Sequence, residues 1–159
     1  MSVQTWKRVL SSAEYVFQTY LLNVRLGQIL VNKPQKYKTN YTDKILGTAM
    51  DALENVLAAD SIYLSRYSLE QDFLKRRAYL QDAKAQVRSV ATLSFVFLET
   101  VRKQDYSINE YVNDIDWLLG RMSSQEIEIG DMCEKCHKLI SGLIKSDAEL
   151  YRKYIRARD

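Results

Sequence analysis

The sequence predicts an all-α protein whose four helices form an up-down-up-down bundle. Five glycines and one proline in 159 residues are too few for a loop-rich or β-rich protein. Apolar residues recur at helical spacing in every long segment, and no segment alternates with the period of a strand. Four amphipathic helices joined by short turns favour this bundle, and the length favours a single domain over residues 1–159.

The first helix is predicted over residues 3–32, with apolar positions such as Val9, Val16 and Val24 on one face. It ends at Lys33-Pro34 because the residue before a proline is pushed out of the α region. A second helix is predicted over 42–67, with Thr42 as its N-cap and an acidic residue in its first turn.

The third helix is predicted over 69–103, because Ser68 and Gln71 have the spacing of a capping box. The fourth is predicted over 108–155, opening with Ser107 as a cap. A further capping box, Ser123 with Glu126, leaves two alternatives, a continuous fourth helix or one broken near residue 123.

Charge alternates along the chain although the net charge is only +3. Residues 1–45 and 75–103 are basic, whereas 46–74 and 104–159 are acidic. In a four-helix square the two basic helices lie diagonally, so each has two acidic neighbours. One interpretation is complementarity within the bundle through weak rim pairs.

A second interpretation concerns a basic stripe on the third helix, formed by Arg77, Lys84, Arg88 and Arg102. At 100° per residue these side chains fall within roughly 40° of one another, beside the apolar face. The helical wheel places no acid in the stripe. Such a stripe suits a neighbouring subunit or a nucleic acid, and a solvated face is the alternative.

Residues 31–47 span the place where the chain stops looking helical, and they hold the only proline, Pro34. Its tyrosines, interleaved with lysines, could stack on unpaired bases while the ammonium groups hold phosphates. We therefore predict partner contact here rather than mere solvation. The residues concerned are Lys33, Lys36, Tyr37, Lys38, Tyr41 and Lys44.

The string Cys133-x-x-Cys136-His137 matches the attachment signature of c-type haem. An electron-transfer haem bundle is therefore the alternative function. Against it, both cysteines fall on the apolar stripe of the fourth helix, where a free cysteine behaves as a small hydrophobe. His137 is the only histidine, so one chain offers zinc three ligands at most. We expect no metal and no cofactor.

Enzyme motifs are missing: the sequence has no P-loop and no GxGxxG, and one histidine excludes most acid–base pairs. We predict that the protein is not an enzyme. The N-terminal segment lacks the apolar block of a signal peptide, and no run of about 18 apolar residues exists. These features predict a cytoplasmic protein without a membrane partner.

Three stretches resemble the accessory variability determinant (Avd) proteins of diversity-generating retroelements and the related four-helix-bundle proteins of rRNA intervening sequences. They are LVNKPQKYKTNYTDKILGTAMDALENVLAAD, RRAYLQDAKAQVRSVATLSFVFLE and EIEIGDMCEKCHKLISGLI. The pattern includes a Pro–Lys element after the first helix and an E-I-G-x-M turn, matched by residues 128–132. The resemblance covers most of residues 10–145.

The resemblance implies a non-enzymatic, barrel-shaped homopentamer of four-helix bundles. Such a protein binds the reverse transcriptase of the retroelement, the template-repeat RNA and the cDNA, and supports mutagenic retrohoming. A helical scaffold that binds another protein and no RNA is a further alternative. Carried onto this chain, the basic surface of the family falls on Arg25, Lys33, Lys36, Lys38, Arg76, Arg77, Lys84 and Arg88.

Overall fold

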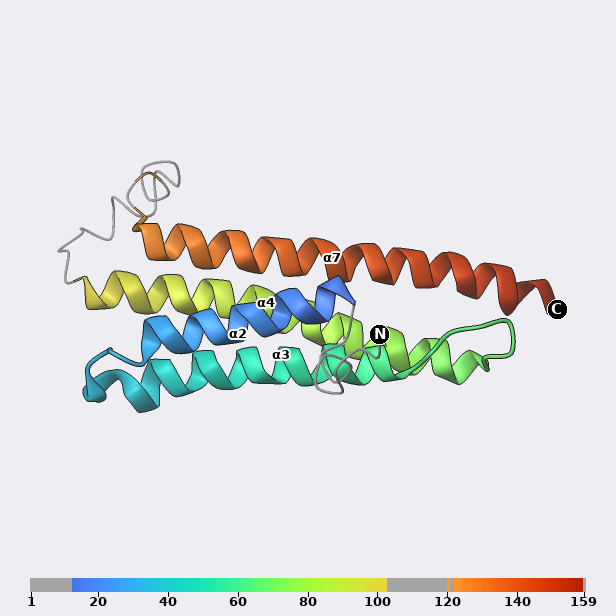
Figure 1. Cartoon of the computed structure of the whole chain (residues 1–159), viewed down its shortest axis with the longest axis horizontal. Coiled ribbons are helices and arrows are strands. Elements are labelled where there is room, and N and C mark those ends of the chain that lie inside the picture. The colour runs from blue at the N-terminus through green and yellow to red at the C-terminus, as the bar shows by residue number, and fades with distance from the viewer. Residues whose placement is uncertain (1–12, 103–119, 121, 159) are drawn as a thin grey trace, which may run out of the picture.

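The computed structural model describes residues 13–102, 120 and 122–158, and this part of the chain is all-helical, as predicted. Four α-helices, labelled in Figure 1, account for most of it: α2 (Glu14–Leu30), α3 (Asp43–Ser61), α4 (Glu70–Val101) and α7 (Ser124–Tyr154). Short turns η1 (Gln35–Tyr37), η2 (Lys38–Thr42) and η3 (Arg156–Arg158) complete it. The predicted helical residues 3–12, 103 and 108–119, and the predicted cap Ser107, lie outside the described residues.

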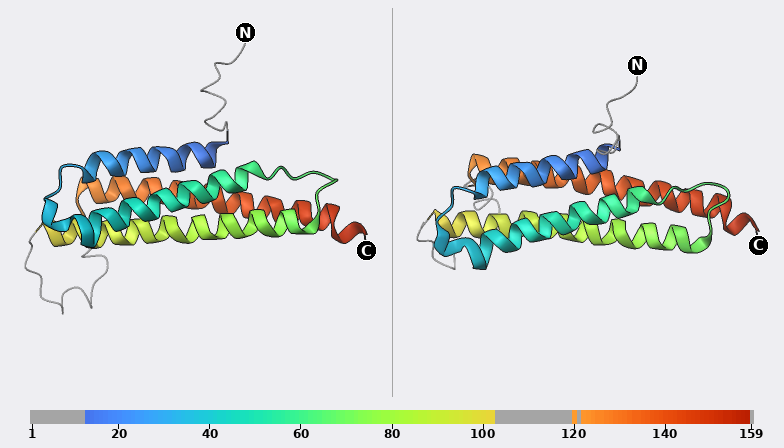
Figure 2. Two further views of the ribbon diagram at one scale, coloured as in Figure 1. Left: turned by 90° about the horizontal axis from the view of Figure 1, so that it is seen from below. Right: turned by 60° about the horizontal axis from the view of Figure 1, so that its bottom comes forward.

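Successive helices run in alternating directions, so the bundle is up-down-up-down (Figure 1). Helix α2 packs against α3 and α7, and α4 packs against the same two helices, so α2 and α4 lie diagonally as predicted. Within the described part, α4 and α7 have 32 and 31 residues, against 17 and 19 for α2 and α3. The α4–α7 pair therefore reaches farther along the bundle, as both views in Figure 2 show.

One apolar core runs between the four helices, and each helix contributes residues at helical spacing. Small side chains on α3, such as Ala49 and Ala52, let its backbone approach its neighbours, and larger ones fill the remaining space. Burying each large side chain contributes about 1.5–3 kcal/mol before the opposing entropy. The largest fully buried ones are Leu22, Leu26, Leu30, Ile45, Leu80, Phe97, Ile129 and Ile140.

One predicted helix end and one predicted cap are wrong. Helix α3 ends at Ser61 rather than at 67, because Ile62 adopts an extended conformation with ψ of 100°. The predicted Ser68–Gln71 capping box does not form, since the Ser68 hydroxyl accepts a hydrogen bond from the amide of Ser65 (2.8 Å). Leu69 takes the N-cap position instead, and its amide donates to the Asp72 carboxylate (2.9 Å).

The start of α7 confirms a local prediction. The Ser123 hydroxyl accepts from the amide of Glu126 (3.3 Å), and the Glu126 carboxylate accepts from the amide of Ser123 (3.1 Å). This capping box begins the helix at Ser124, so α7 does not continue through residue 123. Thr42, by contrast, is itself helical and makes no side-chain cap for α3.

Candidate functional site

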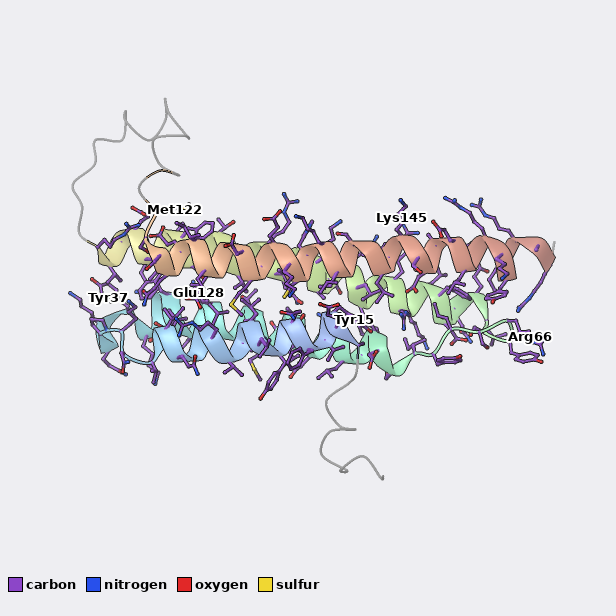
Figure 3. All side chains as sticks on the ribbon, turned by 45° about the horizontal axis from the view of Figure 1, so that its top comes forward. Tyr15, Tyr37, Arg66, Met122, Glu128 and Lys145 are labelled. Atoms are coloured by element: carbon purple, nitrogen blue, oxygen red, sulfur yellow. The ribbon has the colours of Figure 1, made fainter. Side chains whose placement is uncertain are left out.

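The structure divides the predicted basic residues into those with a carboxylate partner and those without. Arg25 of α2 is in the first group. Its Nε and Nη2 donate to the two carboxylate oxygens of Glu128 on α7, at 2.7 and 2.9 Å. This bond lowers the pKa of Glu128 and raises that of Arg25. Figure 3 labels Glu128 on the side of α7 that faces α2. Arg25 therefore joins two helices of the bundle.

Arg76 is also a structural residue, which corrects its assignment to the binding surface. Its Nε donates to Asp147 at 2.6 Å, and Nη1 donates to the carbonyls of Ala59 and Ile62 at 3.1 and 2.9 Å. The side chains of Arg76 and Asp147 are only 12% and 10% exposed. Burial raises the pKa of Asp147, and the guanidinium opposes that rise. Arg76 thus ties the end of α3 to α7.

A second hydrogen bond lies in the same region. The Tyr15 hydroxyl of α2 donates to Asp60 of α3 at 2.9 Å. Burial and this carboxylate both raise the tyrosine pKa, and the charges of Arg76 and Asp147 also act on it. Each of the four helices therefore contributes one side chain to a polar cluster beside the core, which we call the buried cluster: Tyr15, Asp60, Arg76 and Asp147.

Acidic side chains lie beside Arg102, at one end of the predicted basic stripe, whereas the helical wheel predicted none there. Arg102 bonds to Glu99 on its own helix and to Glu126 at the start of α7. The Glu126 side chain is fully buried. A guanidinium beside it supplies the compensating charge that a buried carboxylate requires. Arg102 therefore joins the end of α4 to the start of α7.

The side chains of the other three stripe residues, Arg77, Lys84 and Arg88, make no ion pair or hydrogen bond among the described residues. They lie on the side of α4 that meets α7. His137 of α7 faces them: burial lowers its pKa, and the charges of Lys84 and Arg88 lower it further. The acid that acts on His137 is Glu134, which is bonded to Lys138 (2.8 Å).

Near the far end of this surface, a pocket of about 380 Å³ opens between α4 and α7. Arg77 borders it from α4, and Arg152 and Arg156 border it from the C-terminal part of the chain. These two arginines were missed by the sequence analysis, although they belong to a visibly basic tail, YRKYIRARD. We call this surface the α4/α7 groove: Arg77, Lys84, Arg88, His137, Arg152 and Arg156, with the pocket at its end.

The connection between α2 and α3 holds the other predicted binding residues, two tyrosines and four lysines. Tyr37 and Tyr41 are half-buried, and their ring centroids lie 5.7 and 5.2 Å from that of Phe97 in the core. Tyr41 stacks on Phe97 and Tyr37 meets it edge to face, so both rings are partly engaged with the core, a contact that the base-stacking prediction did not include. Lys36, Lys38 and Lys44 are exposed, and Lys33 is half-buried. The connection lies at the opposite end of the bundle from the C-terminus (Figure 1), so these lysines do not join the pocket end of the groove.

The cysteines of the haem-like string lie in the core, 3% and 0% exposed. Burial raises the pKa of Cys133 to about 12 and that of Cys136 to about 11, so both thiols are protonated at neutral pH. His137 points toward the α4/α7 groove instead. A haem could reach both sulfur atoms only if α7 left the core, and the packing therefore disfavours the haem alternative.

Among the described residues, no group of three or more His, Cys, Asp or Glu side chains is placed to hold a metal ion. No helix in the same part of the chain combines the length and apolar character needed to cross a bilayer. No protein-family model, curated protein or solved structure matches the chain.

Proposed function

We propose that this chain is a non-catalytic accessory protein of a diversity-generating retroelement. It binds the reverse transcriptase and the template RNA or cDNA in the cytoplasm and supports mutagenic cDNA synthesis. The proposal combines the sequence resemblance with one structural observation. Three cations of the stripe on α4, Arg77, Lys84 and Arg88, have no carboxylate partner in the described part of the chain, whereas Arg25, Arg76 and Arg102 each have one.

A row of unpaired cations on a rigid helix favours a polyanion. Lys84 and Arg88 lie seven and eleven residues beyond Arg77, which corresponds to about 10 and 16 Å along the helix axis. Phosphates bound along such a row release counterions, so affinity falls as salt rises and depends little on sequence. These properties suit a protein that holds an RNA template for a polymerase.

The test reverses two charges of the groove. We expect Arg77→Glu with Arg88→Glu to abolish binding of a fluorescein-labelled RNA at physiological salt, measured by anisotropy, and to leave the helical circular dichroism unchanged. A matched control, Lys75→Glu with Lys153→Glu, changes the net charge equally on residues outside the groove. Equal binding by the groove variant and the control would overturn the proposal.

We further propose that the chain forms a ring-like homo-oligomer, the pentamer that the resemblance implies. Its support is an exposed apolar stripe on each of two helices. Phe17, Val24 and Val31 recur every seven residues on α2 and at its end, and Met50 and Leu57 do so on α3; all five are at least 40% exposed. Exposed apolar residues grouped in this way are typical of protein interfaces.

Light scattering tests the assembly directly. We expect a solution mass of five times the single-chain mass of 18.5 kDa, and a shift toward the single-chain mass for Val24→Asp with Leu57→Asp. A wild-type protein that stays at the single-chain mass at micromolar concentration would contradict the oligomer.

A further inference from the structure

The pocket of the α4/α7 groove combines an apolar lining with a cationic border. Its apolar wall comes from both helices, and one member, Leu74, is 54% exposed despite its size. The rings of Phe73 and Tyr151 meet edge to face with centroids 5.6 Å apart. The apolar lining residues are Phe73, Leu74, Ile144, Ala148 and Tyr151.

Two carboxylates lie near the pocket, and both are already engaged. Asp147, which also lines the pocket, is bonded to Arg76. Glu70 accepts a hydrogen bond from the Tyr151 hydroxyl at 2.6 Å. The three bordering arginines, in contrast, make no ion pair among the described residues. An occupant with a flat apolar part and a negative charge beside it would complement this arrangement.

We propose that the α4/α7 groove binds single-stranded rather than double-stranded nucleic acid, with one unpaired base in the pocket and the following phosphates along Arg77, Lys84 and Arg88. The inference rests on the proposed function and adds the class of nucleic acid. A duplex keeps its base faces inside the stack, and extruding a base costs a few kcal/mol. An unpaired base enters an apolar site without that cost.

The position of Arg77 connects the two parts of the groove. It lines the pocket and also begins the row that continues through Lys84 to Arg88. A strand whose base occupies the pocket therefore has its next phosphates beside cations.

The test compares a labelled single-stranded RNA with the duplex of the same sequence, by fluorescence anisotropy at fixed salt. We expect the wild-type protein to bind the single strand on the order of tenfold tighter, the effect of one well-stacked base. Ala148→Phe fills the pocket and should remove this preference while leaving duplex affinity unchanged.

A second variant keeps the test valid if Ala148→Phe does not fold. Leu74→Gln removes an apolar wall at an exposed position and should also reduce the preference. Its matched control is Val96→Gln, on the same helix and 51% exposed but outside the pocket, which should retain the wild-type preference. Circular dichroism establishes that each variant is folded.

The outcomes separate this inference from the proposed function. Equal wild-type affinities for single strand and duplex, or an unchanged preference in folded Ala148→Phe or Leu74→Gln, would overturn the pocket assignment. The proposed function would survive that result if Arg77→Glu with Arg88→Glu still weakened binding. Absence of binding to either RNA would overturn both.

Discussion

Arg76 and Arg77 are neighbours on α4, and they belong to regions with opposite properties. Arg76 enters the buried cluster, where it bonds to Asp147 and to two carbonyls at the end of α3. Arg77 is exposed in the α4/α7 groove, with no ion pair in the described part of the chain. Consecutive residues on a helix differ by about 100° in direction. That single step separates an arginine that holds the fold from one that is available to a partner.

The difference shows that a count of basic residues is a poor guide to a binding surface. A guanidinium inside the bundle is bound by fixed acceptors, and removing it leaves those groups unsatisfied. A guanidinium at the rim stabilises the fold little, because water and salt screen it. It can therefore be used for binding without loss of stability.

The largest effect is expected for Arg76→Ala, which breaks the buried cluster. It removes the donor to the Asp147 carboxylate and to the carbonyls of Ala59 and Ile62, of which only Ala59 keeps another, the amide of Ile62. We expect a loss of about 3–5 kcal/mol in the free energy of unfolding. Arg77→Ala is the matched control and should change stability by less than about 0.5 kcal/mol. Denaturant unfolding measures both, and equal losses would remove the distinction between the two regions.

The next largest effect is expected for Tyr41, one of the two tyrosines that the sequence predicted to stack on bases. Because the Tyr41 ring stacks on Phe97 in the core, we expect Tyr41→Ala to destabilise the protein by about 2 kcal/mol. Tyr63, which is 85% exposed, provides the control, and Tyr63→Ala should change stability little. If Tyr41→Ala leaves unfolding unchanged but weakens RNA binding, the connection belongs to the binding surface after all.

A smaller effect is expected for Arg77→Ala, which should lower the affinity for RNA. Loss of one charge-assisted phosphate contact should weaken single-stranded RNA binding about tenfold. It should also reduce the slope of log K against log salt by about 0.7. Lys75→Ala, two residues earlier and outside the groove, should leave both quantities at their wild-type values. A matching loss in both variants would show that only the overall charge matters.

The smallest effect is a pH dependence from His137. Burial and the charges of Lys84 and Arg88 lower its pKa in the folded protein, against the opposing charge of Glu134. The unfolded chain therefore binds the proton more readily, so this contribution to stability is present above about pH 6.5 and is lost as pH falls below it.

Substitution of this residue isolates the effect, because the chain has no other histidine. Denaturant midpoints of the wild type should fall between pH 7 and pH 5 more steeply than those of His137→Gln. Parallel midpoints would show that His137 does not face the cations of the groove.

Features encoded by neighbouring residues could be predicted from the sequence. The Ser123–Glu126 capping box, an end of the first helix a few residues before Pro34 and the diagonal placement of the basic helices all follow from local spacing and order. The stripe on α4 was also found from spacing, and three of its four members, Arg77, Lys84 and Arg88, have no ion pair in the described residues.

Features that depend on distant pairs could not be predicted. Arg76 and Asp147 are 71 positions apart, and Arg25 and Glu128 are 103 apart, so no local pattern indicates that they meet. The contribution of Arg152 and Arg156 to the groove depends on where α7 ends relative to α4. Helical periodicity gives the face of each residue on its own helix, and only packing decides which neighbour covers that face.

The proposed role of the α4/α7 groove requires that a polyanion bind its cations, which have no ion pair in the described part of the chain. A salt titration of single-stranded RNA binding, for the wild type and for Arg77→Glu with Arg88→Glu, tests this most directly. We predict that log K of the wild type falls linearly with log salt and that the variant shows weaker binding with a shallower slope. Wild-type affinity that does not change with salt, or identical titrations for the two proteins, would contradict it.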